Sequence, residues 1–232
     1  MSVPHTTLIL AAGGSSRRMG SDKLFEPLYG GLPTVAFALC AAQECACISD
    51  IVVSTRPESM LAFWDLAKAL HITKLKSVVE NGDTRQDSVF NAVEAADPNT
   101  KFFAVHDAAR PFASPELMAR VCNDAYTYGA AFPGVAVKDT IKQIKDGFVE
   151  QTPPRERLVA VQTPQVFDAG LYRRAMALAR STGCQYTDDC QLMEHMGVRV
   201  YVSRGEEINF KLTTPLDLER ATDIAGKLFN GG

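Results

Sequence analysis

The stretch TTLILAAGGSSRRMGSDK, residues 6–23, indicates the fold because it joins a short apolar run to a loop of glycines and basic residues. TTLIL is apolar and β-branched, which is typical of a buried strand. Gly13 and Gly14 follow it, and glycine lets backbone N–H groups approach an anion closely. The stretch therefore predicts a phosphate-binding loop at the end of a strand, with a flexible turn of solvated charges as the alternative. It matches neither the dinucleotide fingerprint nor the P-loop.

The chain beyond this loop alternates short apolar runs with amphipathic segments. The pattern predicts strands at residues 6–10, 50–55, 75–80 and 102–107, and helices at residues 33–44, 57–70, 86–96 and 114–129. This order indicates a single α/β domain over residues 1–232, with a mostly parallel open sheet and helices on both faces. Ligands of such sheets bind beyond the carboxyl ends of the strands, where the first loop lies.

The alternation breaks at residues 138–157, where Asp146-Gly147 stands between short runs that contain Ile, Phe and Val. Asp-Gly in that setting predicts a β-hairpin. The segment has little apolar mass to bury, so we expect an arm that projects from the body and packs on a second subunit. After the arm, the pattern predicts helices at 168–180 and 187–197, a strand at 198–203, and a last helix that starts with a near capping box of Thr214, Pro215 and Asp217.

Composition argues against several classes of protein. The 232 residues carry a net charge of −3, so the chain as a whole does not suggest nucleic acid or a membrane surface as a partner. No apolar run is long enough to span a bilayer, and the N-terminus lacks the features of a signal peptide. The six cysteines and four histidines show no metal-ligand spacing. We therefore expect free thiols in a cytoplasmic protein.

A second cluster, NGDTRQDSV at residues 81–89, directly follows a predicted strand. Gly82-Asp83 makes a turn, and Ser88 lies early in the next helix. Taken alone, this cluster indicates a turn and a helix start rather than a binding site.

A third cluster, VHDAARPF at residues 105–112, follows another predicted strand. The pairs His106-Asp107 and Arg110-Pro111 flank two alanines, an arrangement that core packing does not explain. Small residues let a ligand come close, while Asp107 and Arg110 supply opposite charges. The alternative is an Asp–Arg pair that braces a loop.

Two weaker candidates lie downstream. VQTPQVF places Thr163 and Gln165 around a proline, and NFKLTTP places Lys211 just before the last helix. A lone lysine usually belongs to a solvated face, but the surroundings of Lys211 suggest the end of a strand near the ligand edge.

Together these motifs resemble the 2-C-methyl-D-erythritol 4-phosphate cytidylyltransferase family, whose fold is Rossmann-like and of the nucleotide-diphospho-sugar transferase type. The resemblance runs along almost the whole chain, through AAGGSSRRMG, NGDTRQDSV, HDAARPF, VKDT, QTPQ, TDD and KLTTPLDL. Two features depart from the family pattern. The first loop is about one residue longer, so that the functional arginine is Arg18 by its position before Met19, with Arg17 as the alternative. The usual Pro-Lys-Gln around the loop lysine is Asp22-Lys23-Leu24 here.

The resemblance implies a role for each matching position. The catalytic residues would be Arg18, Lys23, Arg155 and Lys211, with Arg157 as the alternative to Arg155. CTP would contact Ala11, Ala12, Gly13, Gly14, Gly82, Asp83, Ser88, Ala108 and Thr163. The methylerythritol phosphate would contact Asp107, Arg110, Thr140 and Thr187 in addition to Arg155 and Lys211. The arm residues would come from the neighbouring subunit of a homodimer.

The implied reaction joins CTP to a polyol phosphate and releases pyrophosphate. The product, 4-diphosphocytidyl-2-C-methyl-D-erythritol, is an isoprenoid precursor. The attacking phosphate monoester is already mostly a dianion at neutral pH, so the reaction needs no general base. Catalysis must come from positioning and charge neutralisation. A divalent cation, expected to be Mg²⁺, would bridge the triphosphate oxygens with Asp107 as its protein ligand.

Two other functions fit part of the pattern. A cytidylyltransferase that acts on ribitol 5-phosphate shares the fold and many of the motifs, although HDAARP and TDD favour methylerythritol phosphate. A catalytically silent nucleotide-binding subunit is the second alternative. A silent relative need not keep the whole basic set of Arg18, Lys23, Arg155 and Lys211.

Overall fold

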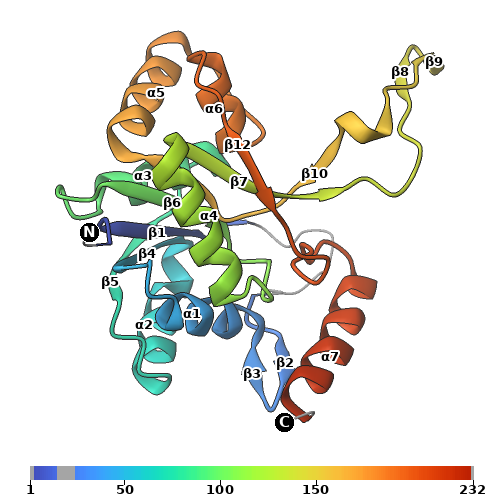
Figure 1. Ribbon diagram of the computed structural model, residues 1–232. Coiled ribbons are helices and arrows are strands. Elements are labelled where there is room, and N and C mark those ends of the chain that lie inside the picture. The colour runs from blue at the N-terminus through green and yellow to red at the C-terminus, as the bar shows by residue number, and fades with distance from the viewer. Residues whose placement is uncertain (1–2, 15–23, 231–232) are drawn as a thin grey trace.

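The computed structural model describes residues 3–14 and 24–230, which fold around a central sheet (Figure 1). The strands of this sheet are β1 (Thr6–Ala11), β4 (Asp50–Thr55), β5 (Leu75–Glu80), β6 (Phe102–Asp107), β7 (Ala130–Ala136), β10 (Val159–Val161), β11 (Gln165–Asp168) and β12 (Tyr201–Arg204). Their order is β10-β7-β11-β6-β1-β4-β5, and β12 pairs with β7.

The centre of the sheet is parallel, as the β-α order predicts. β1 pairs in parallel with β4 and β6, and β5 continues in the same direction beyond β4. β11 runs antiparallel between β6 and β7, and β10 runs antiparallel along β7. The sequence pattern did not predict β7, β10 or β11. β10 and β11 have only three and four residues, and β7 contains Pro133 and Gly134, which weaken a strand signal. Because β11 runs opposite to β6, β11 begins beside the end of β6. The residues just before β11 therefore lie at the carboxyl end of β6.

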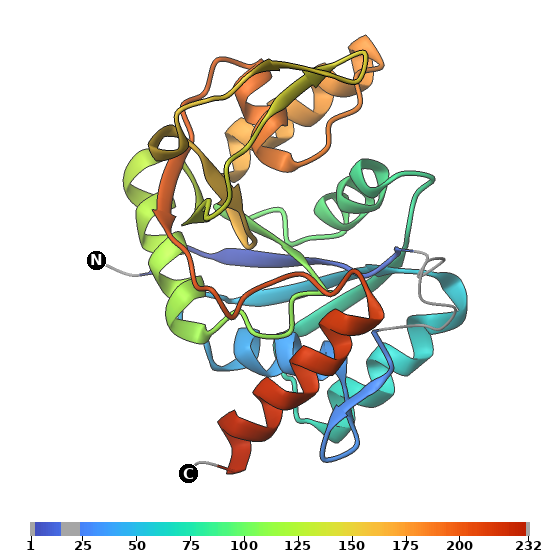
Figure 2. The same ribbon diagram turned by 90° about the vertical axis from the view of Figure 1, so that its right-hand side faces the viewer.

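Helices cover both faces of the sheet (Figure 2). One face carries α1 (Thr34–Glu44), α2 (Met60–Ala69) with the 3₁₀ turn η1 (Pro57–Ser59), and α4 (Pro115–Tyr128), and the other carries α3 (Arg85–Glu94), α5 (Ala169–Thr182) and α6 (Asp189–His195). Side chains alternate along β1, so Leu8 and Leu10 enter the first core and Ile9 enters the second. Full burial of each such side chain contributes roughly 1.5–3 kcal/mol. The helices on the two faces of the sheet confirm the three layers predicted from the sequence.

Side-chain caps fix where two helices begin at the ligand edge. Thr84 Oγ1 accepts a hydrogen bond from the Asp87 backbone at 3.1 Å, and Asp87 accepts one from the Thr84 backbone at 3.3 Å. The same reciprocal pair joins Thr214 and Asp217 at the start of α7 (Pro215–Asn230), which confirms the predicted capping box. α7 packs against β2 (Pro27–Tyr29), which pairs with β3 (Leu32–Pro33).

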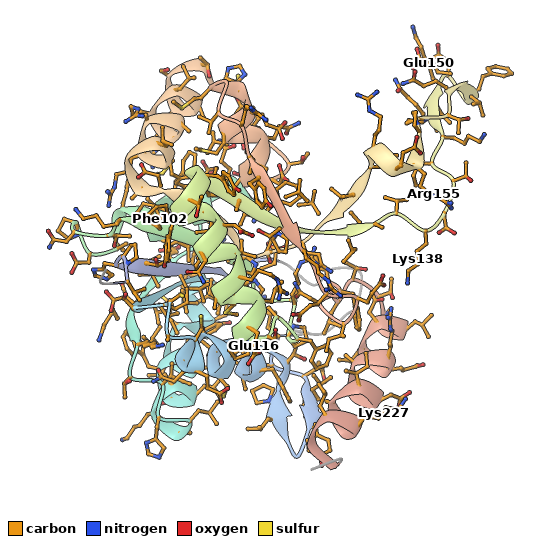
Figure 3. The ribbon with its side chains drawn as sticks, in the orientation of Figure 1. Phe102, Glu116, Lys138, Glu150, Arg155 and Lys227 are labelled. Carbon is orange, nitrogen blue, oxygen red and sulfur yellow. The ribbon has the colours of Figure 1, made fainter. Side chains whose placement is uncertain are left out.

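The arm at residues 138–157 is a hairpin that projects from the body (Figures 1 and 3). Its strands are β8 (Gln143–Lys145) and β9 (Phe148–Gln151), followed by the 3₁₀ turn η2 (Arg155–Arg157). Asp146 and Gly147 turn the chain with φ angles of 51° and 84°, so the Asp-Gly prediction is confirmed. Ile144, Phe148 and Val149 are exposed there, with Phe148 79% exposed.

The six cysteines are free thiols, as expected from their spacing. Over the described ranges, no helix combines the length and apolar character that crossing a membrane requires.

Candidate active site

A cavity of about 510 Å³ opens at the carboxyl ends of β1, β4, β5 and β6. This is the edge at which an open α/β sheet binds its ligands. The cavity is lined by Ala11, Ala12, Gly13, Gly14, Leu24, Arg56, Asn81, Gly82, Asp83, Thr84, Arg85, Ser88, Asp107, Ala109 and Lys211. The loop after β1, the turn after β5 and the end of β6 thus face one space, although they lie far apart in the sequence.

Two glycines allow close approaches at the cavity wall: Gly13 lets the loop after β1 approach the turn after β5, and Gly82 lets that turn approach α3. A Cβ atom on Gly13 would lie 2.5 Å from Cβ of Asn81, and one on Gly82 would lie 2.4 Å from Cβ of Asp87. Both distances are shorter than any real contact, so neither position accepts a side chain without a shift of its neighbour. Ser88 Oγ accepts a hydrogen bond from the Gly82 backbone at 3.1 Å and holds the turn against α3. The structural interpretation of NGDTRQDSV is therefore correct, and the same contacts place the turn on the cavity wall.

Asp107, the last residue of β6, is the acidic centre of the cavity. Arg85 Nε donates to one carboxylate oxygen at 3.1 Å, and Lys211 Nζ donates to the other at 2.8 Å. Burial by itself would raise the pKa of Asp107, but Arg85 and Lys211 outweigh burial and hold the pKa well below its ordinary value. Asp107 therefore stays ionised.

Arg85 is a site residue that the sequence analysis did not single out. Its guanidinium also donates to Asp189 at 2.8 Å, and the other oxygen of Asp189 accepts a short hydrogen bond from the buried hydroxyl of Tyr172. Burial lowers the pKa of Arg85, but Asp189 and Asp107 outweigh it and raise the pKa above its ordinary value. The available signal was the arginine inside NGDTRQDSV together with the second acid of TDD.

His106 is a structural member of the third cluster. Thr163 Oγ1 accepts from the Asp107 backbone at 3.1 Å and lies 2.9 Å from Nδ1 of His106, and Nε2 lies 3.2 Å from the carbonyl oxygen of Arg110. The Nε2–H tautomer satisfies all of these contacts. Burial lowers the pKa of His106 to about 4, so the imidazole is neutral and has no spare nitrogen for proton transfer.

Arg110 bridges the end of β6 to the segment before α7. Its guanidinium donates to the carbonyl oxygens of Asn209 at 2.8 Å and Val161 at 3.3 Å. No carboxylate among the described residues forms an ion pair with Arg110, and its buried Nε has no hydrogen-bond partner there. Arg110 itself is not among the residues that line the cavity, although its neighbour Ala109 is.

The structure brings part of the expected site together. Ala11, Ala12, Gly13, Gly14, Gly82, Asp83, Ser88, Asp107 and Lys211 line the cavity. Ala108 and Thr163 lie buried beside it, with the Ala108 backbone bonded to Ala11. Thr187 is exposed just before α6, while Thr140 and Arg155 lie on the projecting arm. Arg18 and Lys23, with the alternative Arg17, lie outside the described residues.

The chain is similar to proteins of one family. A model of the family described as 2-C-methyl-D-erythritol 4-phosphate cytidylyltransferase matches residues 6–227. The protein of that name from Synechocystis sp. is 38% identical over 224 residues, which cover 95% of this chain and 96% of the relative. The one from Symbiobacterium thermophilum is 40% identical over 220 residues, which cover 93% and 90%. The crystal structure of 4-diphosphocytidyl-2C-methyl-D-erythritol synthase from Anaerococcus prevotii matches with a TM-score of 0.86 at 29% identity, covering 96% of both chains.

Proposed function

This chain belongs to the 2-C-methyl-D-erythritol 4-phosphate cytidylyltransferase family, and we propose that the cavity described above is its active site. As a member of this family, the chain transfers the cytidylyl group of CTP to 2-C-methyl-D-erythritol 4-phosphate in isoprenoid biosynthesis. The observation that supports this proposal most directly is the meeting of the glycine loop, the Gly82-Asp83 turn and the Asp107–Lys211 pair around one cavity. The fold places all three at the ligand edge.

CTP lies along the first loop and the turn in this proposal. The backbone of Ala11, Ala12, Gly13 and Gly14 follows the nucleotide, with Gly82, Asp83, Ser88, Ala108 and Thr163 around the base and ribose. Small residues line this wall, so a pyrimidine fits more easily than a purine. Arg18 and Lys23 neutralise the triphosphate and the charge that develops as pyrophosphate leaves.

The polyol phosphate lies at the opposite end, between Asp107 and Arg110. Lys211 lines the cavity, as do Arg56 and Arg85. In this proposal Lys211 and Arg110 aim the phosphate, and Thr187 contacts it from the segment before α6. The phosphate dianion attacks the α-phosphate of CTP directly. The neutral, fully bonded His106 supports a mechanism without a general base.

The residues of the cavity fit a Mg²⁺ ion that CTP brings with it. Each oxygen of Asp107 accepts one hydrogen bond, from Arg85 or Lys211, and a carboxylate has about four acceptor positions in all. Asp83 lines the same cavity. Mg²⁺ is commonly held by substrate phosphates with one or two carboxylates, so Asp107 is the proposed protein ligand. The ion, when bound, neutralises charge on the triphosphate.

The arm completes the site of a partner subunit in this proposal. Arg155 donates to the carbonyl oxygen of Lys138 at 2.8 Å, and Lys138 pairs with Glu207 at 2.8 Å, so the base of the arm is braced in an extended position (Figure 3). Exposed Ile144, Phe148 and Val149 need cover that the chain's own body does not provide. A homodimer with exchanged arms brings Thr140 and Arg155 to the neighbouring cavity. The free thiols fit the reducing cytoplasm as its location.

Pyrophosphate release from CTP tests the assignment of the cavity. We expect turnover with 2-C-methyl-D-erythritol 4-phosphate and little with ribitol 5-phosphate, assayed side by side. Lys211→Met keeps the length of the side chain but removes its charge, so it should raise KM for the polyol phosphate more than tenfold. Lys227→Met, an exposed lysine on α7, is the matched control. Equal kinetics in the two variants would remove Lys211 from the site.

A further inference from the structure

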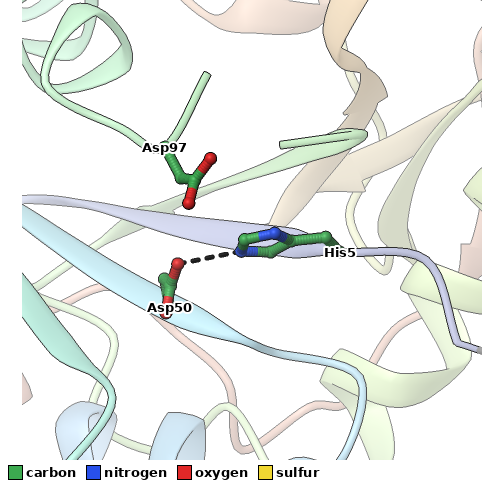
Figure 4. A group of neighbouring side chains, drawn as sticks. All are labelled: His5, Asp50 and Asp97. Atoms are coloured by element: carbon green, nitrogen blue, oxygen red, sulfur yellow. Dashed lines mark hydrogen bonds and ion pairs between the residues drawn. The ribbon is translucent and has the colours of Figure 1, made fainter. Parts of the chain in front are cut away.

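A second group of polar side chains lies at the edge of the sheet opposite the active site. His5 directly precedes β1, Asp50 begins β4, and Asp97 follows α3. The ligand atoms of these three side chains all lie within 4.8 Å of one another (Figure 4). Their positions in the sequence show no metal-ligand spacing, because the parallel strands alone bring them together.

The distances suit one small cation. Nε2 of His5 lies 2.8 Å from Oδ2 of Asp50. Zinc–nitrogen and zinc–oxygen bonds measure about 2.0–2.2 Å, so two ligand atoms on one tetrahedral ion lie about 3.3–3.6 Å apart, and the His5–Asp50 contact opens by less than about 1 Å to admit the ion. Figure 4 shows the Asp97 carboxylate directed toward this pair. The Asp97 side chain is exposed, so a rotation about its own bonds can close the remaining gap.

Backbone and side-chain hydrogen bonds hold the three segments in place before any ion binds. The Lys101 backbone donates to the carbonyl oxygen of His5 at 2.8 Å, and Thr7 and Thr100 join their hydroxyls at 2.8 Å. The Thr100 backbone donates to the carbonyl oxygen of Asp97 at 2.9 Å. The loop that carries Asp97 is therefore tied to the strand that follows His5, and little order has to be created on binding.

The charges of the group also favour a cation. Two carboxylates surround one imidazole, and Lys76 reaches Asp50 only at 4.0 Å through an exposed side chain. An ion pair of this kind contributes little, so the ammonium can withdraw at small cost.

We propose that His5, Asp50 and Asp97 form a binding site for a divalent transition-metal ion of the Zn²⁺ class, with water completing its coordination. Imidazole nitrogen selects Zn²⁺, Co²⁺ or Ni²⁺ over Mg²⁺, which prefers oxygen ligands alone. The ion ties the beginnings of β1 and β4 to the loop between α3 and β6. Its role is structural, and it lies apart from the phosphate chemistry at the other edge of the sheet.

A substitution of Asp97 distinguishes a metal site from a simple hydrogen bond between His5 and Asp50. In an untagged, metal-stripped protein, Zn²⁺ binding is measured by isothermal titration and Co²⁺ binding by visible absorption. Asp97→Asn keeps an oxygen for the Asn99 backbone, which donates to it at 2.7 Å, and leaves the His5–Asp50 contact intact. It should still weaken Zn²⁺ binding at least about tenfold, since even outer partners of metal ligands matter by about 10–100-fold.

Matched variants complete the test. His5→Ala should weaken Zn²⁺ binding at least as much as Asp97→Asn, whereas His71→Asn, which removes an exposed histidine, should not change it. At the same Zn²⁺ concentration, the thermal midpoint of the wild type should rise more than that of Asp97→Asn, while pyrophosphate release by Asp97→Asn stays at the wild-type rate. Zn²⁺ affinity that is equal in wild type, His5→Ala and Asp97→Asn, or thiolate-to-Co²⁺ absorption bands that indicate cysteine ligands, would overturn the proposal.

Discussion

At Asp107 burial and charge act in opposite directions. The carboxylate lies inside the protein, where ionisation is unfavourable, yet Arg85 and Lys211 keep it ionised. Arg85 in turn depends on Asp189, which is 104 positions away along the chain. The HDAARPF motif indicated Asp107 and Arg110 as a functional pair, but no local pattern shows which distant carboxylate anchors an arginine. The motif thus indicated Asp107 as a candidate, and Asp107 lines the cavity, but the motif did not indicate the partners of Asp107 and Arg85.

A double-mutant cycle on Arg85 and Asp189 measures this partnership. Arg85→Met removes the cation that Asp107 and Asp189 share. Loss of one partner of a buried ion pair lowers the free energy of unfolding by about 3–5 kcal/mol. Asp189→Asn also destabilises the fold, but the double variant should lose clearly less than the sum of the two single changes. Urea denaturation gives the three values. Lys138→Met, in the exposed pair with Glu207, should change stability by less than about 1 kcal/mol.

Additive losses in this cycle would mean that Arg85 and Asp189 act independently, contrary to their 2.8 Å contact.

His106 makes stability depend on pH. Its folded pKa of about 4 lies below the ordinary value near 6.5, so the unfolded chain takes up a proton first as the pH falls. The neutral form therefore contributes stability that is fully present above about pH 6.5 and is lost as the pH falls toward 4. We expect a loss of about 3 kcal/mol from this group over that range. Urea unfolding of the wild type and His106→Gln at several pH values checks it, since the variant should lack this part of the pH slope.

The elements of the protein show why local patterns located the glycine loop but missed several strands, β11 among them. The strand at residues 6–10 is apolar throughout and fully buried, and a continuous apolar run is a strong signal. β11 has four residues and follows a proline, so its signal is weak. It is nevertheless the strand that carries Thr163 to the end of β6, where the hydroxyl meets the Asp107 backbone. The residues that precede an antiparallel strand thus lie at the carboxyl edge of the parallel strands. A prediction that every strand is parallel does not place them there.

Substitutions of Gly13 and Gly14 test whether the loop after β1 must lie close to the turn after β5. A methyl group on Gly13 would meet Asn81 at 2.5 Å, whereas one on Gly14 has no atom of residues 3–14 or 24–230 within 4 Å. Overpacking of this kind costs about 1–3 kcal/mol, so Gly13→Ala should lower the unfolding free energy by that amount. Gly14→Ala should leave it within about 1 kcal/mol of the wild type. Equal values in chemical denaturation would show that Asn81 yields and that the close approach of the two loops is not required.

At the scale of the whole molecule, the order of motifs along the chain predicted the architecture, because β-α alternation restricts the possible topologies. The helices on both faces, the mostly parallel sheet and the hairpin at the Asp-Gly turn agree with that expectation. The proposed exchange of arms between two chains does not follow from this alternation and was suggested by the low apolar mass of residues 138–157. The arm holds Arg155 away from the chain's own cavity, and only its exposed apolar side chains point to a partner.

Mixed dimers test the exchange of arms. Arg155→Ala and Lys23→Ala chains should each be nearly inactive alone, since each lacks a cation that stabilises the transition state in the proposed site. In a mixed dimer, one site combines both lesions and the other has neither. After random exchange, the mixture should therefore regain about one quarter of the wild-type pyrophosphate release. A mixture that stays inactive after exchange is demonstrated, or a chain that sediments as a monomer, would contradict the shared site.

Lys211 is already paired with a carboxylate, so an anion that approaches it also meets the negative charge of Asp107. In the proposed site, a lone phosphate ion that contacts Lys211 alone is therefore attracted by one group and repelled by the other. A substrate that also reaches Arg110 and the glycine loop forms several charge-assisted hydrogen bonds that offset the repulsion. In this proposal, the negative charge of Asp107 disfavours small, abundant anions and favours a substrate that contacts several cations at once.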